Sequence, residues 1–438
     1  MAVVLNLKLE TAMSLMLMAI ICLPSFAKMP VQAKAQQKLL AQGSSAARLN
    51  NTAGPMSPEQ DSDRKDSLAQ IFNEGVSDFN RADFTQAALK FKEVLDQDPE
   101  NTKARNNLAL CFKRQGQLKL AQNEFEILCR ENPHNSEFLN NLGCTHLALN
   151  EIEQAIILFH EALRLDPENS RAYFNLAHAL VKKNAIAEAI EAYHSALKID
   201  NENPYFHRDL GDAYMTNLQA EQALFEYRQA VKKGDGANDC QIRIAKALEV
   251  VGKYNQARTF LAPVLAQEPN NTEALITMGA VSWKLGKLDE AKTHLERALD
   301  LNAASTEARN NLAIVLFHQG KSEEAMLLWR QSLMAAPSNS QVHYNLGVAL
   351  YESDLLEQAK PAFEEAFSFD SKNAYAKYYL GLIAHKQGKD NLAINYFKEA
   401  LLINSQLQPA KLKLDSLLGN AQASGHRSSY VSGTKANI

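Results

Sequence analysis

The sequence predicts an all-α protein, built as a solenoid of ten stacked helix pairs. Three observations predict it, each counted in units of 34 residues from Leu68: position 20 is always alanine, position 8 is always small, and position 24 is always large. The alanines are Ala87, Ala121, Ala155, Ala189, Ala223, Ala257, Ala291, Ala325, Ala359 and Ala393. Ten alanines in ten units cannot arise from composition, so the period reflects a repeated structural unit.

Each unit is expected to be a helix–turn–helix hairpin. Apolar residues recur at helical spacing within each half of the unit. Small residues at positions 8 and 20 let two helices approach closely, and the large residue at position 24 fills the space beside them. Proline at position 32 of five units ends the second helix, since it lacks an N–H and clashes inside a helix. One hairpin cannot bury its own apolar face, so the units must stack.

Residues 1–27 are predicted to be a signal peptide. Lys8 precedes an apolar run over residues 12–23, and small residues at Ser25 and Ala27 suit cleavage after Ala27. We therefore expect an exported protein, periplasmic or secreted. An uncleaved segment that anchors the protein to the membrane is the alternative, although the run is short for a membrane span.

The rest of the chain is expected in four parts. Residues 28–66 are predicted to be a disordered linker, 67–407 the ten repeats, 408–419 a capping helix that Pro409 helps to start, and 420–438 a disordered tail. The repeats are expected at 68–101, 102–135, 136–169, 170–203, 204–237, 238–271, 272–305, 306–339, 340–373 and 374–407. Glycines at 234 and 236 predict a joint that bends, and Pro361 predicts a kink in the second helix of repeat 9.

The repeats resemble the tetratricopeptide repeat family. The segment Asn140–Asn169, NNLGCTHLALNEIEQAIILFHEALRLDPEN, follows the family pattern closely, and the match in length and residue class extends over residues 68–407. The resemblance implies a right-handed superhelix in which the first helices of the hairpins line a concave groove. It also implies a protein that binds other proteins or peptides.

Position 6 of the repeats supplies the candidate binding residues, because it lies on the first helix beside the buried leucine at position 7. The candidate peptide-binding residues are Asn73, Asn107, Asn141, Asn175, Asp209, Arg243, Asn311 and Asn345. Asparagine is a mediocre helix former, so its recurrence asks for a reason. A side-chain amide donates and accepts hydrogen bonds, and a ladder of amides can hold an extended peptide backbone. The ladder resembles that of O-linked N-acetylglucosamine transferase. Alternatively, these amides bond within the solenoid.

Two further patterns concern the same groove. Position 12 carries Phe79, Trp283, Phe317, Tyr351 and His385, which either line the groove or pack in the core. The carboxylate clamp of chaperone-binding family members needs a particular set of lysines and asparagines over three consecutive repeats. No three consecutive repeats meet it, so we do not expect capture of a chaperone C-terminus.

Several classes of function are not expected. The chain has 46 basic and 50 acidic residues, a balance that gives no electrostatic footprint for nucleic acid. It has no HExxH, GxSxG, Walker or GxGxxG motif, so we expect no catalytic residues, no enzyme activity, no bound metal and no cofactor. Cys111, Cys129 and Cys144 lie in adjacent repeats, where one disulfide or buried free thiols are both open.

The sequence therefore predicts a non-enzymatic scaffold that binds extended segments of protein partners and assists the assembly of an envelope, pilus or secretion complex. The alternative is a regulatory or substrate-presenting partner of a separately encoded glycosyltransferase or polysaccharide-export enzyme.

Overall fold

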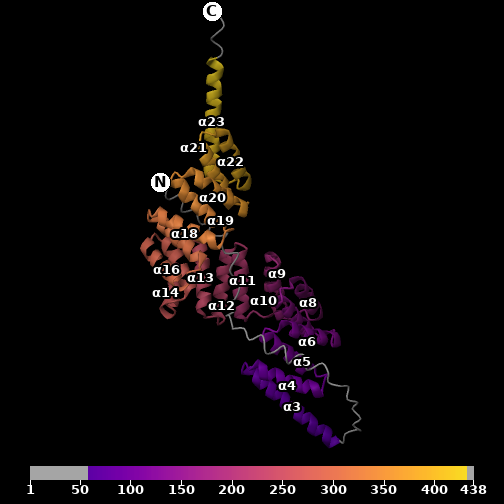
Figure 1. Ribbon diagram of the computed structural model, residues 1–438. Coiled ribbons are helices and arrows are strands. Elements are labelled where there is room, and N and C mark those ends of the chain that lie inside the picture. The colour runs from indigo at the N-terminus through magenta and orange to yellow at the C-terminus, as the bar shows by residue number, and fades with distance from the viewer. Residues whose placement is uncertain (1–57, 432–438) are drawn as a thin grey trace, which may run out of the picture. The chain divides into compact units, whose positions relative to one another are not determined.

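The computed structural model describes the backbone of residues 58–431 and the side chains of residues 64–419. The described residues form the helices α3 to α23, and no strand occurs among them. They divide into two compact units, which meet in the sequence between Asp235 and Gly236. Within each unit, consecutive helices pack against one another (Figure 1), so the predicted all-α solenoid is confirmed.

The N-terminal unit contains five helix pairs, and the first helix of each pair is odd-numbered. Its helices are α3 (Pro58–Asn80), α4 (Phe84–Gln97), α5 (Thr102–Arg114), α6 (Leu118–Glu131), α7 (Ser136–Ala148), α8 (Ile152–Leu165), α9 (Ser170–Lys182), α10 (Ile186–Ile199), α11 (Pro204–Thr216) and α12 (Ala220–Lys232).

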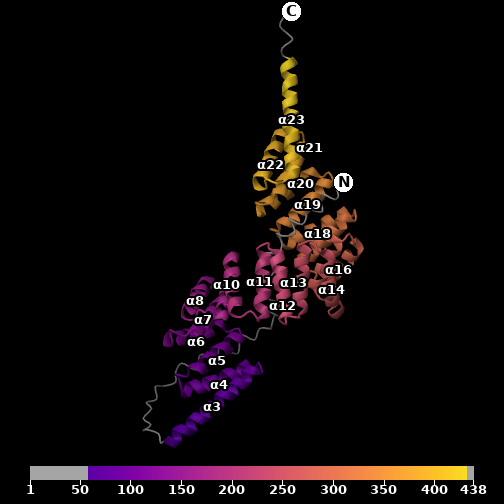
Figure 2. The same cartoon turned by 180° about the vertical axis from the view of Figure 1, so that it is seen from behind.

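The C-terminal unit contains five further pairs and a last single helix. Its helices are α13 (Asn238–Val250), α14 (Tyr254–Gln267), α15 (Thr272–Lys284), α16 (Leu288–Leu301), α17 (Thr306–His318), α18 (Ser322–Ala335), α19 (Ser340–Glu352), α20 (Leu356–Phe369), α21 (Ala374–Lys386), α22 (Asp390–Ile403) and α23 (Gln408–Val431). The last three pack in order, as the reverse view shows (Figure 2).

The repeated small and large residues form the core between paired helices. All ten alanines at position 20 are completely buried, and the large residues at position 24 are at most 2% exposed. In repeat 5, a Cβ added to Gly211 would lie 2.5 Å from Tyr227 Cε1, so the ring occupies the space that the glycine leaves. The close approach that the sequence predicts at position 8 is therefore real at Gly211.

Local hydrogen bonds and turn geometry set the helix boundaries. Asn101 precedes α5, and its Oδ1 accepts a hydrogen bond from Ala104 N at 3.0 Å, which caps the helix. Between the two helices of each repeat, position 15 adopts a left-handed conformation, with φ from 59° at Asp354 to 80° at Gly320. Five repeats place glycine there, which this conformation favours, but repeat 5 has Leu218 at φ 60°.

Helix α3 begins earlier than the sequence analysis expects. It starts at Pro58, inside the segment predicted as disordered linker (28–66). Proline suits the first position of a helix, because its fixed φ matches the helix and its missing N–H costs no hydrogen bond there. The extension is tied to the solenoid, because Arg64 Nη2 donates a hydrogen bond to Gln97 O at 2.6 Å.

Helix α23 ends later than expected. It runs from Gln408 to Val431, past the predicted end of the capping helix at residue 419 and into the predicted tail. Leu407, Ala410 and Leu417 bury its beginning against the last repeat. Once a helix is nucleated, each further residue adds a hydrogen bond at little cost, and no proline follows Pro409 to stop it.

The remaining predictions concern Pro361, the signal peptide and the possible membrane anchor. Helix α20 runs as one helix with Pro361 inside it, and the kink expected at Pro361 stays a prediction. The predicted signal peptide and residues 28–57 lie outside the described residues, as do residues 432–438. In the described part of the chain, no helix has the length and apolar content that a membrane crossing requires.

Candidate functional site

The odd-numbered helices carry the candidate ligand-binding surface, which we call the first-helix face. Position 6 of each repeat lies on these helices, and its asparagines are exposed or partly buried. Some of these side-chain amides form hydrogen bonds within the solenoid and others do not. The residue type at position 6 does not distinguish the two groups.

Three position-6 asparagines bond within the solenoid. Asn141 Nδ2 donates to Asn106 Oδ1 at 3.3 Å, and Asn175 Nδ2 donates to Asn140 Oδ1 at 2.9 Å. In the C-terminal unit, Asn345 Nδ2 donates to Asn310 Oδ1 at 3.0 Å. Each bond joins position 6 of one repeat to position 5 of the preceding repeat, so these amides hold neighbouring first helices in register.

The position-5 asparagines are structural groups. Asn140 and Asn310 are 9% and 5% exposed. Asn310 Oδ1 also accepts a hydrogen bond from Nε1 of the buried Trp329 at 2.9 Å. A buried amide left without partners is costly, and the position-6 asparagine of the next repeat donates a hydrogen bond to each of these two amides.

The remaining asparagines of the ladder have no such partner. Asn107 follows a repeat with Phe72 at position 5, Asn311 follows one with Ile276, and Asn73 lies in the first repeat. Within residues 64–419, the side chains of these three asparagines make no hydrogen bond. The rule is readable from the sequence: a position-6 amide is engaged where the preceding position 5 is also asparagine.

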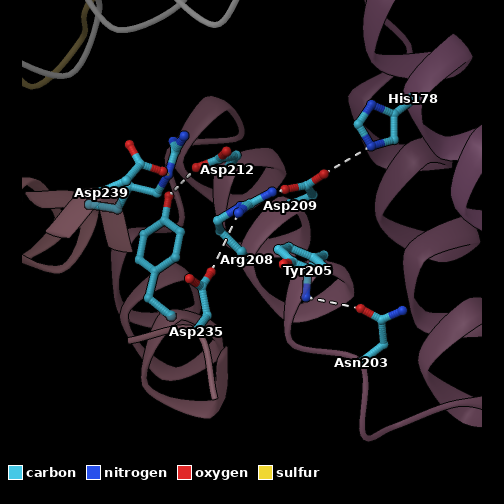
Figure 3. A network of polar contacts seen from close by, with 10 residues as sticks. His178, Asn203, Tyr205, Arg208, Asp209, Asp212, Asp235 and Asp239 are labelled. Atoms are coloured by element: carbon cyan, nitrogen blue, oxygen red, sulfur yellow. Dashed lines mark hydrogen bonds and ion pairs between the residues drawn. The ribbon is translucent and has the colours of Figure 1, made fainter. Parts of the chain in front are cut away.

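The charged members of the candidate set are paired within their own units. Asp209 Oδ2 lies 2.9 Å from His178 Nε2, and Asp209 Oδ1 accepts from Arg208 Nε at 3.0 Å (Figure 3). Burial alone would raise the pKa of Asp209, but the hydrogen bond from His178 and the charge of Arg208 together lower it. In the C-terminal unit, Arg243 Nε donates to Asp239 Oδ2 at 3.1 Å.

A hollow opens on the first-helix face between α7 and α9, with a volume of about 300 Å³. Its lining comes from these two helices alone: Cys144, Leu147, Ala148, Phe174, Asn175, His178 and Lys182. The Phe174 ring packs edge-on against His178, with centroids 4.5 Å apart, and stacks on Phe206. Asn175 was predicted from the sequence but the hollow was not, because its lining combines positions 5, 6, 9, 12 and 13 of two repeats.

For the position-12 side chains the sequence left two locations open, the groove and the core, and most of them pack against the core. Trp283, Phe317 and Tyr351 are partly buried and pack against the core of the C-terminal unit. Phe79 packs in the same way in the N-terminal unit. His385 is exposed, and its Nδ1 lies 2.6 Å from Asp390 Oδ1.

A second charged cluster lies on α13 and α15. Lys246 Nζ contacts Glu273 Oε1 at 2.7 Å. Burial raises the pKa of the neighbouring Glu249 to about 7, against the opposing charge of Lys284. Among the described residues, no group of histidine, cysteine and carboxylate side chains is arranged to hold a metal.

The cysteines of the described residues are free thiols. Burial raises the pKa of Cys111 and of Cys129 to about 11, and it also raises the pKa of Cys144. These thiols are poor nucleophiles near neutral pH, because the thiolate is the reactive form.

Family models agree with this architecture. One model of the tetratricopeptide repeat matches residues 112–169, 140–204 and 344–409, and a second matches 81–140, 248–296 and 282–346. Together they cover more than half of the chain, so the chain belongs to the tetratricopeptide repeat family. A comparison with curated proteins found no match.

Solved structures with the same fold are similar to the chain at low identity. The APC/C hetero-tetramer Cut9–Hcn1 is 16% identical, with a TM-score of 0.50, over 80% of this chain and 76% of that chain. The pilF protein of Pseudomonas aeruginosa is 21% identical (TM-score 0.43; 48% and 96%). YrrB, described as a TPR protein with an unusual peptide-binding site, is 23% identical (TM-score 0.38; 42% and 95%). The similarity to the Cut9–Hcn1 assembly shows the fold alone.

Proposed function

We propose that this protein is a non-enzymatic scaffold that holds extended segments of partner proteins on its first-helix face. The fold supports a protein–protein interaction scaffold. One observation carries the finer proposal: Asn107 and Asn311 present amides without a partner in the described chain, whereas Asn141, Asn175 and Asn345 are engaged.

An unengaged amide on a rigid helix suits backbone recognition. It donates and accepts at once, as a peptide bond does, so it binds an extended segment without selecting its side chains. The packed helices hold it in place before binding, which lowers the ordering cost of the complex. The N-terminal unit offers Asn73 on α3 and Asn107 on α5, and the C-terminal unit offers Asn311 on α17.

The experiment uses the full chain and a random peptide display library. Segments selected by the wild type are then measured against the double variant Asn107→Ala/Asn311→Ala. We expect at least a tenfold weaker affinity, since a segment bound on either unit would lose the bidentate contact that the unengaged amide of that unit supplies. Asn123→Ala is the matched control, because Asn123 is an exposed asparagine on α6, the second helix of the same repeat as Asn107.

The control should bind as the wild type does. Unchanged affinity in the double variant would show that these amides do not contact the segment, and the proposal would then be wrong.

The biological setting is part of the proposal. The predicted signal peptide motivates a role in assembling an envelope, pilus or secretion complex. A regulatory or substrate-presenting role beside a separately encoded glycosyltransferase or polysaccharide-export enzyme is the second candidate, motivated by the asparagine ladder. A pulldown from an envelope extract separates them, because recovery of a single stable enzyme partner favours the second role and several structural components favour the first.

A further inference from the structure

The hollow between α7 and α9 has the size of a side-chain pocket. Its volume of about 300 Å³ lies at the lower end of the range for ligand sites, so it has room for one large apolar side chain. Leu147 and Phe174 line it, together with the Cys144 thiol, which is neutral because burial raises its pKa. Its interior therefore favours an apolar occupant.

The polar groups beside the hollow are held in fixed positions. Asn175 Nδ2 is engaged by Asn140 Oδ1, which orients the amide and leaves Asn175 Oδ1 without a partner in the described chain. The His178 ring is fixed by Asp209 at 2.9 Å and by the neighbouring Phe174 ring. Asn175 Oδ1 can thus accept a backbone N–H from a segment whose side chain enters the hollow.

Two positive charges act at the hollow, those of Lys182 and Lys113, and Arg114 follows Lys113 in the sequence. Lys113 and Arg114 are the last two residues of α5, and Lys182, a lining residue, is the last of α9. The charge of Lys113 acts on the Cys144 thiol. None of the three cations forms an ion pair among the described residues. Lys119, on a second helix of this unit, is in contrast neutralised by Glu151 at 2.9 Å.

We propose that this hollow binds an apolar side chain of a partner segment whose neighbouring residues are acidic. The apolar lining selects the anchor, Asn175 Oδ1 takes a backbone N–H, and Lys113, Arg114 and Lys182 attract the flanking carboxylates by charge complementarity. The inference rests on the proposed function, and it names the class of segment that the N-terminal unit binds.

The test uses the full-length protein and an immobilised array of synthetic peptides. Each peptide carries one variable residue, and its neighbours are either glutamates or lysines. Leucine, methionine or phenylalanine beside glutamates should bind at least tenfold more tightly than alanine beside glutamates or leucine beside lysines. Equal binding beside glutamates and lysines would overturn the charge argument, and equal binding of alanine and leucine would overturn the pocket argument.

Variants localise the effect. Lys113→Glu/Arg114→Glu should weaken binding of the acidic peptides at least tenfold and shift the preference toward lysine-flanked peptides. Arg130→Glu, an exposed charge reversal on α6, is the control and should change binding less than twofold. Ala148→Trp, at an exposed position on the rim, should cover the hollow and weaken binding without disturbing the core.

Other occupants give distinct results that would overturn the proposal. A second copy of the chain would appear as a dimer in light scattering that Ala148→Trp dissociates. A lipid would appear as binding to anionic phospholipid vesicles in place of the peptides. If the affinity of the selected segments falls on substitution of Asn107 and Asn311 but not of Lys113 or Ala148, this inference fails while the proposed function stands. If no substitution changes the affinity of any segment, both fail.

Discussion

Replacing Asn175 with alanine should destabilise the protein, although alanine is the better helix former. The change removes the 2.9 Å hydrogen bond to Asn140 Oδ1, and Asn140 is only 9% exposed. Leaving a buried polar atom without a partner costs about 1–3 kcal/mol. Alanine returns about 0.5 kcal/mol of helix propensity. The net loss should be about 1 kcal/mol of unfolding free energy.

Urea unfolding followed by circular dichroism measures this change, with Asn107→Ala as the matched control. Asn107 occupies the same repeat position but has no partner in the described chain. Its replacement should leave the midpoint unchanged or raise it slightly. Equal effects of the two substitutions would refute the assignment of Asn175 to a structural bond and of Asn107 to a free amide.

Three further outcomes follow from the same structure. Leu218→Gly should raise the free energy of unfolding by about 1 kcal/mol in urea, because the exposed Leu218 has a left-handed φ of 60°. Gly116→Leu at the same repeat position should lower it by a similar amount. A lower free energy of unfolding for Leu218→Gly would contradict the strain argument. Burial raises the pKa of Glu249 from 4.5 to about 7, so the folded state binds a proton that the unfolded chain releases, and stability falls as pH rises through this window. Glu249→Gln should therefore gain about 3 kcal/mol of stability relative to the wild type between pH 4 and pH 8, and parallel pH profiles would count against it. We propose that the chain is cleaved after Ala27 on export, so mass spectrometry of the protein purified from cells should find Lys28 at its N-terminus, and a retained Met1 would argue for the uncleaved anchor.

The fold was predictable because its determinants recur. Ala87 and Ala393 occupy the same buried position, where only a small side chain lets the two helices of a repeat pack closely. Because this position is alanine in all ten repeats, the helix pairs could be predicted even where a single repeat was ambiguous. The ends were less predictable, since they have a neighbour on one side only. Neither the start of α3 at Pro58 nor the end of α23 at Val431 is set by the repeat pattern. Both depend on local helix propensity, which is a weak guide to boundaries.

The candidate site was predictable only in part. The asparagines at position 6 were found from the sequence. Whether each one forms a hydrogen bond within the solenoid depends on the residue at position 5 of the preceding repeat, which a comparison of position 6 alone does not include. Asn141 and Asn107 look alike in the sequence, yet only Asn141 faces an asparagine across the helix interface. The hollow beside Phe174 and Leu147 was missed for the same reason, because a cavity is a property of two packed helices and not of one repeat.

The central claim is that Asn141, Asn175 and Asn345 stabilise the solenoid through hydrogen bonds to neighbouring repeats, whereas Asn107 and Asn311 serve ligand binding alone. The most direct test measures both stability and peptide affinity for single alanine variants of Asn107, Asn311, Asn141, Asn175 and Asn345. We predict that Asn107→Ala and Asn311→Ala weaken binding at unchanged stability, whereas the other three lower stability. Stability losses at Asn107 and Asn311 equal to those at the other three, with no change in affinity, would contradict the account.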